Sequence, residues 1–430
     1  MPAAMSSDTV PSPTGSSAGP LLGLDGEPLR IGVLTSGGDA QGMNAAVRAV
    51  VRTALAKGAQ PYAILEGWQG ACDGGDSIKK MDWSDVSSIL AEGGTVIGTA
   101  RSAEFRTYEG RHRAAANLLE HGIDHLVVIG GDGSLSGTNE FRGEWSQHLA
   151  ELVAEGAITQ EFADAHPALI IVGLVGSIDN DMVGTDMTIG ADTALHRILD
   201  AIDQLTSTAA SHQRTFVVEV MGRHCGYLPL MAAVAGGADY VFTPEDPVGQ
   251  GWQDDLAEHL RLGREAGRRE SIVLVAEGAH DRDGNELSTQ LIADTIQERT
   301  GEDARVTILG HVQRGGTPSA YDRWMSTLLG YAAVQEILAS TGEDEPVILG
   351  VRRNRITRVP LMKAVHDTRA VKDYIAAGDY VTAQAARGSS FSSMVSIYHL
   401  LSTPPQLIPE PTGDIKRVAI LHAGGLAPGM

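Results

Sequence analysis

Three aspartates stand close together after one β-branched stretch of the chain. The stretch ends at Val175, and Asp179, Asp181 and Asp186 follow within a short glycine-containing loop. Carboxylates held this close repel one another unless they bind a cation or take up a proton. A carboxylate beside a hydroxyl can also accept its proton when the oxygen attacks a phosphoryl group. Asp179 is therefore the candidate base, with Asp181 holding it or a metal, although a solvated acidic loop would look similar.

Two glycine-rich turns also follow strand-like stretches. One contains Gly37 in residues 34–44, and the other is Gly131-Asp132-Gly133-Ser134. Glycines allow the backbone to approach an anion, and a following helix favours negative charge at its N-terminus. Asp132 could hold Mg²⁺ while phosphates lie on the amides. The chain has no Gly-Lys pair for a Walker A loop. Gly137 stands one residue too far along for a dinucleotide-binding fingerprint.

Arginines next to glycines or at strand ends form the third group. In these positions a guanidinium can bind a phosphate through two hydrogen bonds. The stretches concerned are Ser211–Arg214, Met221–His224, Arg305 and His311–Arg314. Their three histidines lack the spacing of a zinc site, so hydrogen-bonding roles are expected for them.

Composition limits the possible functions. The 430 residues carry a net charge of −21, which argues against a face that wraps nucleic acid or an anionic membrane. No apolar run reaches the length of a membrane-spanning helix. Two cysteines cannot build a disulfide framework or a four-cysteine zinc site, and the reducing cytoplasm is the expected location.

Most of the chain alternates short β-branched runs with helix-length segments. Strands are predicted at 29–34, 62–65, 125–129, 169–174, 215–220, 240–242, 271–276, 306–309 and 347–349. Helices are predicted at 42–57, 110–121, 191–207, 253–266, 289–300 and 323–340. This pattern indicates an α/β fold with mostly parallel sheets covered on both faces. The turns after Leu34, Ile129, Leu174 and Val220 should converge between two Rossmann-like lobes, because ligands gather at the carboxyl ends of such strands.

The remaining segments suggest a domain plan. Residues 1–28 have the composition of a disordered leader, 29–387 form the two-lobed unit, and 388–414 form a connector around one short helix. Residues 137–167 are predicted to be a surface insertion, with a polar helix over 145–158. Residues 417–430 repeat the pattern of 30–43, so 415–430 are expected to begin a second, truncated repeat of a roughly double-length protein and to be poorly packed.

Five motifs occur in one order: T-S-G-G-D-A-x-G-M-N, G-G-D-G-S, S-I-D-N-D, M-G-R-H-C-G and G-H-V-Q-R-G-G. Through these motifs the chain resembles the phosphofructokinase family, over nearly its whole length from Ile31 to Met430. Ser177 and the long insert are more similar to the double-length, animal-type branch. The resemblance implies transfer of a phosphoryl group from MgATP to the 1-hydroxyl of fructose 6-phosphate in glycolysis. It also implies two α/β lobes with the active site between them. It further implies that the enzyme is allosteric.

The resemblance also assigns residues to roles. Asp179 would be the catalytic base and Arg223 the second catalytic residue. Asp132 would bind the metal ion. The ATP-binding residues would be Gly37, Arg101, Ser102, Gly131, Asp132, Gly133 and Ser134. The substrate-binding residues would be Ser177, Ile178, Asp179, Arg214, Met221, Gly222, Arg223, Glu277, Arg305, His311, Val312, Gln313 and Arg314. Arg214 and Arg305 would reach in from a neighbouring subunit, which implies a homo-oligomer, a dimer or tetramer.

Three alternatives stay open. A pyrophosphate-dependent phosphofructokinase would carry Asp in place of Gly133 and Lys in place of Gly176, so both glycines favour ATP. An NAD or lipid kinase shares the G-G-D-G turn without the other four motifs. A non-catalytic regulatory half would bind sugar phosphate without turnover, although Asp132, Asp179 and Arg223 are all present. The absence of a basic residue in 204–208 makes ADP activation at the family's effector site doubtful.

Overall fold

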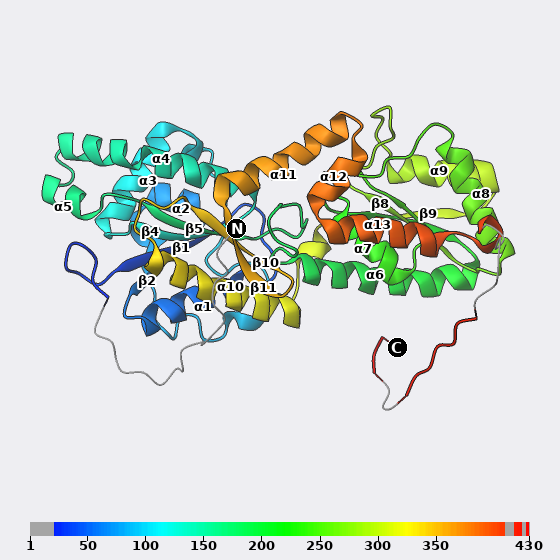
Figure 1. Cartoon of the computed structure of the whole chain (residues 1–430), viewed down its shortest axis with the longest axis horizontal. Coiled ribbons are helices and arrows are strands. Elements are labelled where there is room, and N and C mark those ends of the chain that lie inside the picture. Colours follow the sequence, from blue (N-terminus) through cyan, green and yellow to red (C-terminus); the bar gives the residue numbers. More distant parts are fainter. Residues whose placement is uncertain (1–20, 409–416, 424–426, 430) are drawn as a thin grey trace.

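The computed structural model describes residues 21–408, 417–423 and 427–429. They form two lobes, each built on one sheet with helices on both faces (Figure 1). Helix α11 (Leu361–Ala376) leads from the first lobe toward the second. The α/β class with mostly parallel sheets is therefore confirmed.

The first lobe holds a seven-stranded sheet in the order β11-β10-β5-β4-β1-β2-β3. Its parallel strands are β1 (Arg30–Ser36), β2 (Gln60–Ile64), β4 (His125–Gly130), β5 (Ile170–Val175) and β10 (Val347–Arg352). Two antiparallel strands, β3 (Ile78–Lys80) and β11 (Arg355–Pro360), close its edges. Both edge strands were missed in the sequence, since each is short or contains several charged residues.

Alternate side chains of these strands enter two separate cores. Val127 and Ile129 pack in one core, whereas Leu126 and Val128 pack in the other. Helices α1 (Met43–Ala56) and α10 (Ala320–Ala339) cover the first of these faces. The opposite face is covered by α2 (Trp68–Asp73), α3 (Tyr108–Glu120), α4 (Asp132–Ala154), α5 (Gln160–Ala165) and α11.

The second lobe contains a four-stranded parallel sheet in the order β7-β8-β6-β9. Its strands are β6 (Thr215–Val220), β7 (Tyr240–Phe242), β8 (Ser271–Ala276) and β9 (Ala304–Ile308). On one face lie α6 (Ala191–His212), α7 (Tyr227–Gly236) and α13 (Ser389–Ser402). The other face is covered by α8 (Trp252–Glu265) and α9 (Thr289–Thr300).

A buried carboxylate joins the lobes where α6 begins. Asp322 of α10 accepts hydrogen bonds from the backbone amides of Gly190 and Thr193, both at 2.9 Å. These are free amides of the first turn of α6, so the carboxylate satisfies them and lies at the positive end of the helix dipole. Burial nevertheless raises the pKa of Asp322 to about 6.

The predicted surface insertion at 137–167 is wrong. These residues belong to the continuous helix α4, which starts at Asp132, and to α5. Phe141 and Trp145 of α4 are almost completely buried, so this helix supplies core packing rather than a solvated excursion. The polar residues that suggested an insertion occupy its other face. In the sequence these polar residues indicated a solvated segment more strongly than Phe141 and Trp145 indicated a buried one.

Helices α12 (Tyr380–Arg387) and α13 return the chain to the second lobe. The predicted connector from 388 onward therefore begins with a packed helix, because Phe391, Val395 and Tyr398 of α13 are buried. Residues 417–423 form no strand in the described structure, and Val418, Ile420 and Leu421 are each at least 86% exposed. The second repeat stays a prediction, and 1–20, 409–416, 424–426 and 430 lie outside the described residues.

None of the helices in the described ranges has both the length and the apolar character required to cross a lipid bilayer.

Candidate active site

A cavity of about 830 Å³ opens where the two lobes meet. The ends of β1, β4 and β5 lead into it, as the strand order requires of a parallel sheet. Arg223, His224 and Arg314 line it from the second lobe, and Arg369 and Lys372 line it from α11. We call this space the interlobe cavity. The predicted convergence of the turns after β1, β4, β5 and β6 is confirmed.

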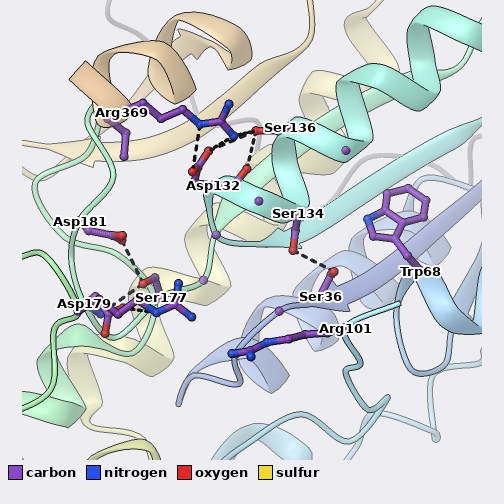
Figure 2. A pocket seen from close by; sticks show the side chains of 18 of the residues that line it. Ser36, Trp68, Arg101, Asp132, Ser134, Ser136, Ser177, Asp179, Asp181 and Arg369 are labelled. Carbon is purple, nitrogen blue, oxygen red and sulfur yellow. Dashed lines mark hydrogen bonds and ion pairs between the residues drawn. The ribbon is translucent and has the colours of Figure 1, made fainter. Parts of the chain in front are cut away.

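The two glycine turns form one side of the interlobe cavity. Gly37 has a left-handed φ of 93°, and a Cβ there would lie 3.3 Å from the Ser134 hydroxyl. Ser134 donates a hydrogen bond of 2.9 Å to Ser36, which ties the two turns together (Figure 2). A Cβ added at Gly131 or Gly133 would meet nothing within 4 Å. The backbone at the start of α4 is therefore open to a large anion, at the positive end of a 23-residue helix.

Asp132 offers an oxygen ligand at the same helix end. Its carboxylate forms an ion pair with Arg369, with Nη2 to Oδ1 at 3.0 Å and Nε to Oδ2 at 3.3 Å (Figure 2). The Asp132 side chain is 32% exposed. A hard carboxylate beside open amides fits Mg²⁺, which binds through one or two carboxylates and takes its other ligands from phosphates and water. Arg369 would share the carboxylate with that ion.

Asp179 is a buried residue of the cavity wall. It is only 3% exposed, and its Oδ1 has no hydrogen-bond partner. Its Oδ2 is 3.8 Å from Nε of Arg223. Burial, followed by the nearby charge of Asp181, raises its pKa to about 6, although Arg314 and Arg223 oppose the shift. A buried carboxylate with a free oxygen and a raised pKa has the properties of a general base.

The loop that carries Asp179 is held by its own side chains. Asn180 has a left-handed φ of 49°, and its side-chain oxygen accepts a 2.7 Å hydrogen bond from the amide of Thr188. Ser177 donates to Asp181 at 3.2 Å, and the amide of Asp179 donates to Ser177 at 3.3 Å. These contacts fix the direction of the Asp179 carboxylate.

Two arginines face the carboxylate from the second lobe. Arg223 has a left-handed φ of 52°, and its amide donates to Glu277 at 3.1 Å. Nη1 of Arg314 donates to the carbonyl of Asp39 at 3.1 Å, so this guanidinium lies against the first glycine turn. Gln313 accepts a 3.2 Å hydrogen bond from the amide of Met221. The two strand-end motifs of the second lobe therefore hold each other in place.

The structure brings most of the predicted site residues together. Those lining the interlobe cavity are Gly37, Arg101, Ser102, Gly131, Asp132, Gly133, Ser134, Ser177, Asp179, Arg223 and Arg314. Those outside its lining are Ile178, Arg214, Met221, Gly222, Glu277, Arg305, His311, Val312 and Gln313. Ile178 is fully buried in the core, so it supports the loop from behind.

Arg214 and Arg305 lie at the opposite end of the second sheet. Both pair with Asp303, at 2.8 and 2.9 Å, beside the first residues of β6 and β9. The cavity meets β6 at its other end, through Arg223. These two arginines therefore do not serve this chain's own cavity. β9 is an edge strand, and Arg305 is partly exposed there.

Several cavity residues were missed in the sequence. They include Ser36, Trp68, Arg111, Arg369, Lys372 and Arg387. The pair Arg369 and Lys372 could have been found, because a spacing of three puts both on one face of a helix. Arg387 carried no such signal. It is almost fully buried, where it pairs with Glu245 at 2.8 Å and donates to the carbonyls of Asp181 and His224, both at 2.8 Å.

Residues 30–337 match the family model described as Phosphofructokinase. The chain belongs to the phosphofructokinase family. The match takes in both glycine turns, the aspartate loop and the arginine motifs of the second lobe.

Curated members of the phosphofructokinase family are similar over most of this chain. The chain is 51% identical over 400 residues to "ATP-dependent 6-phosphofructokinase, liver type" of Homo sapiens, which covers 93% of this chain and 51% of that protein. It is also 51% identical over 404 residues to "ATP-dependent 6-phosphofructokinase 1" of Aspergillus oryzae. The chain spans about half the length of the curated relatives it matches.

Solved phosphofructokinase structures share the fold. The structure of phosphofructokinase from Saccharomyces cerevisiae superposes with a TM-score of 0.85 at 51% identity, covering 86% of this chain and 50% of that one. A pyrophosphate-dependent phosphofructokinase from Marinobacter aquaeolei superposes with a TM-score of 0.63 at 20% identity, covering 78% of this chain and 83% of that one. At that identity the second likeness concerns the fold alone.

Proposed function

We propose that this protein transfers the γ-phosphoryl group of MgATP to the 1-hydroxyl of fructose 6-phosphate, giving fructose 1,6-bisphosphate and ADP in glycolysis. The observation that carries the proposal is the buried Asp179, with one free oxygen, in the same cavity as the open amides of 131–134. One group can accept a proton and the other can hold phosphates. Relatives about half identical to this chain are named ATP-dependent 6-phosphofructokinases.

In this proposal the nucleotide phosphates lie on the two glycine turns, with Arg101 and Ser102 beside them. The amides at the start of α4 and the guanidinium of Arg101 neutralise phosphate charge. Asp132 would hold Mg²⁺, which supplies charge neutralisation across the phosphates when bound. Positioning and electrostatics of this kind account for most of the catalysis of phosphoryl transfer.

Asp179 acts as the base for the sugar hydroxyl. Its carboxylate takes the hydroxyl proton as the oxygen attacks, and Arg223 stabilises negative charge on the transferring group. With a pKa of about 6, the carboxylate is ionised near neutral pH and still basic enough to accept a proton. On the sugar-phosphate side Arg314 lines the pocket, and Met221, Gly222, Glu277 and residues 311–313, which lie outside the lining, would complete that side around it.

Two glycines favour ATP over pyrophosphate as the donor. The space at Gly133 is open, so a nucleotide can occupy it. An aspartate at this position would place a second carboxylate next to Asp132. At Gly176 a Cβ would lie 2.5 Å from Cε of Met43 and 3.3 Å from Cγ2 of Ile129. A lysine there would require at least the end of the Met43 side chain to move.

The proposed sugar-phosphate site is completed by a neighbouring subunit. Arg214 and Arg305 would reach the sugar phosphate of a neighbouring subunit in a homo-oligomer. Their support is their place at the far end of the second sheet, on and beside the edge strand β9.

A coupled assay with purified protein tests the function. We expect fructose 1,6-bisphosphate to form with MgATP and not with pyrophosphate, and Asp179→Asn to lose at least about 100-fold in kcat while still binding fructose 6-phosphate. Turnover with pyrophosphate alone would favour the pyrophosphate-dependent alternative. Tight fructose 6-phosphate binding with no turnover from either donor would indicate a regulatory half.

A further inference from the structure

A group of histidine and glutamate side chains lies between α3 and α4, outside the lining of the interlobe cavity. His112 comes from α3, and His148 and Glu151 come from α4. One ligand atom from each lies within 4.8 Å of the other two. His148 is fully buried, whereas the Glu151 side chain is 40% exposed, so the group is open to solvent on one side.

Two of the three ligand–ligand distances are close to those found around one metal ion. Nδ1 of His112 is 3.2 Å from Nδ1 of His148 and 3.5 Å from Oε2 of Glu151. Ligands at zinc bond lengths in a tetrahedral arrangement are separated by about 3.4 Å. The two rings therefore already lie where a shared ion needs them.

The hydrogen-bonding possibilities of the two rings support a positive charge between them. Nε2 of His112 lies 3.5 Å from Glu155, so a proton there leaves a lone pair on its Nδ1. Nε2 of His148 is buried, lacks a hydrogen-bond partner, and is 3.4 Å from a Glu144 oxygen. If its proton is on Nε2, two Nδ1 lone pairs face each other. If its proton is on Nδ1, an unprotonated nitrogen faces Glu144. With His112 protonated on Nε2, neither neutral tautomer of His148 avoids a repulsive contact. With His112 protonated on Nδ1, that nitrogen can donate to His148, but the unprotonated Nε2 of His112 then faces Glu155.

A cation bound by both Nδ1 atoms removes that conflict. Each Nε2–H would then point toward a glutamate, the outer contact that metal-binding histidines usually make. A second proton on His148 would also remove it. Metal titration distinguishes a bound ion from such a proton.

The surrounding side chains hold the group in place. Arg111 of α3 binds Glu144 of α4 through two contacts of 2.6 and 2.8 Å, one residue away from His112. Tyr108 donates a 2.7 Å hydrogen bond to Glu151. Its ring lies 4.9 Å from that of His148. Because α3 and α4 are already fixed to each other here, an ion would bind without a large rearrangement.

We propose that His112, His148 and Glu151 bind one divalent transition-metal ion of the zinc type. Two imidazoles and one carboxylate suit zinc, and a water molecule would fill the fourth position. His148 is 16 residues, or about 24 Å of helix, from Asp132, so the ion takes no part in phosphoryl transfer. It would instead clamp α3 to the helix that begins at the phosphate-binding turn.

Metal titration of the full chain tests the site. The protein is stripped with a chelator, desalted, and titrated with Co²⁺ and then Zn²⁺ in excess Mg²⁺, which saturates hard-oxygen sites near Asp132. We expect one equivalent of Co²⁺ to give the absorption band of four-coordinate cobalt, Zn²⁺ to displace it, and Zn²⁺ to raise the melting temperature.

His112→Gln and Glu151→Gln are the test variants, because both side chains are partly exposed and tolerate change better than His148. We expect each to lose the cobalt band and at least about tenfold in Zn²⁺ affinity. His196→Gln, at an exposed histidine of α6 beside Asp192, is the matched control and should behave as wild type. Absence of the band in wild type, or equal Zn²⁺ affinity in wild type and His112→Gln, would overturn the proposal and leave a proton shared by the two rings.

Discussion

The ionised carboxylate of Asp179 lowers the stability of the folded chain. Its pKa of about 6 is above the 3.8 of an unburied aspartate, so the folded state binds a proton more tightly than the unfolded state. The resulting loss of stability is absent below pH 4. It grows as the pH rises from about 4 to 6 and is complete above that range. Active-site groups often oppose stability in this way.

We therefore expect Asp179→Asn to inactivate the protein and to stabilise it. Above pH 6 the gain in the free energy of unfolding should reach at most about 3 kcal/mol, and it should vanish below pH 4. Urea unfolding at pH 4 and pH 7.5 measures it. A variant less stable than wild type at pH 7.5 would show that the Asp179 contacts outweigh its burial.

The pH dependence of kcat/KM should report the same carboxylate. We expect an acidic limb with an apparent pKa of about 6, because protonated Asp179 cannot accept a proton. Asp181→Asn should move that limb to lower pH, since the charge of Asp181 raises the Asp179 pKa. An unchanged limb in this variant would assign the titration to another group, whatever the change in kcat.

Gly133 offers a test of donor choice that leaves the fold alone. A Cβ there would meet nothing within 4 Å, and an aspartate in the first turn of a helix is favourable. We expect Gly133→Asp to raise the KM for MgATP at least about tenfold, and Gly133→Asn, which has the same shape without the charge, to raise it much less. Steady-state kinetics with both variants distinguishes electrostatic repulsion of ATP from steric obstruction by the new side chain.

At the scale of elements, the cavity depends on helices that come late in the chain. α11 supplies Arg369 and Lys372, and α12 supplies Arg387 beneath the Asp181 loop. Arg387 and Glu245 are both almost completely buried, and removing one partner leaves the other charge without compensation.

Arg387→Met should therefore lower the free energy of unfolding by about 3–5 kcal/mol. Adding Glu245→Gln should restore part of that loss, because it removes the isolated charge. The control is Arg369→Met, at a pair whose arginine side chain is 55% exposed, where a change below about 1 kcal/mol is expected. Denaturant unfolding of the four proteins measures this, and equal losses for both single variants would contradict it.

At the scale of the whole molecule, the position of Arg214 and Arg305 favours sites completed between subunits. Mixing two inactive variants tests this. Asp179→Asn keeps Arg305, and Arg305→Ala keeps the base. A hybrid dimer would contain one intact site, so a random one-to-one mixture should regain about a quarter of wild-type activity. Activity no greater than the sum of the separate variants would show that Arg305 does not act across an interface.

Local signals in the sequence determined the α/β class, most of the strands and the residues around the two glycine turns. Buried parallel strands are short β-branched runs, and turns that need glycine at positive φ reveal themselves by residue type. The motifs after β1, β4, β5 and β6 and their convergence could therefore be predicted from the sequence. The charged edge strand β11 and the helix α4 were misread, because their polar residues are conspicuous and their packing partners are distant in the chain.

Only the tertiary structure decided which charges meet. The raised pKa of Asp179 depends on burial and on Asp181, Arg223 and Arg314, which come from three separate segments. The pairing of Asp132 with Arg369 joins residues 237 positions apart. The two histidines between α3 and α4 are likewise 36 positions apart. No spacing rule covers such separations, because they depend on how helices pack across a sheet. The chemistry of each group is set by its residue type, but its protonation and partners are set by the fold.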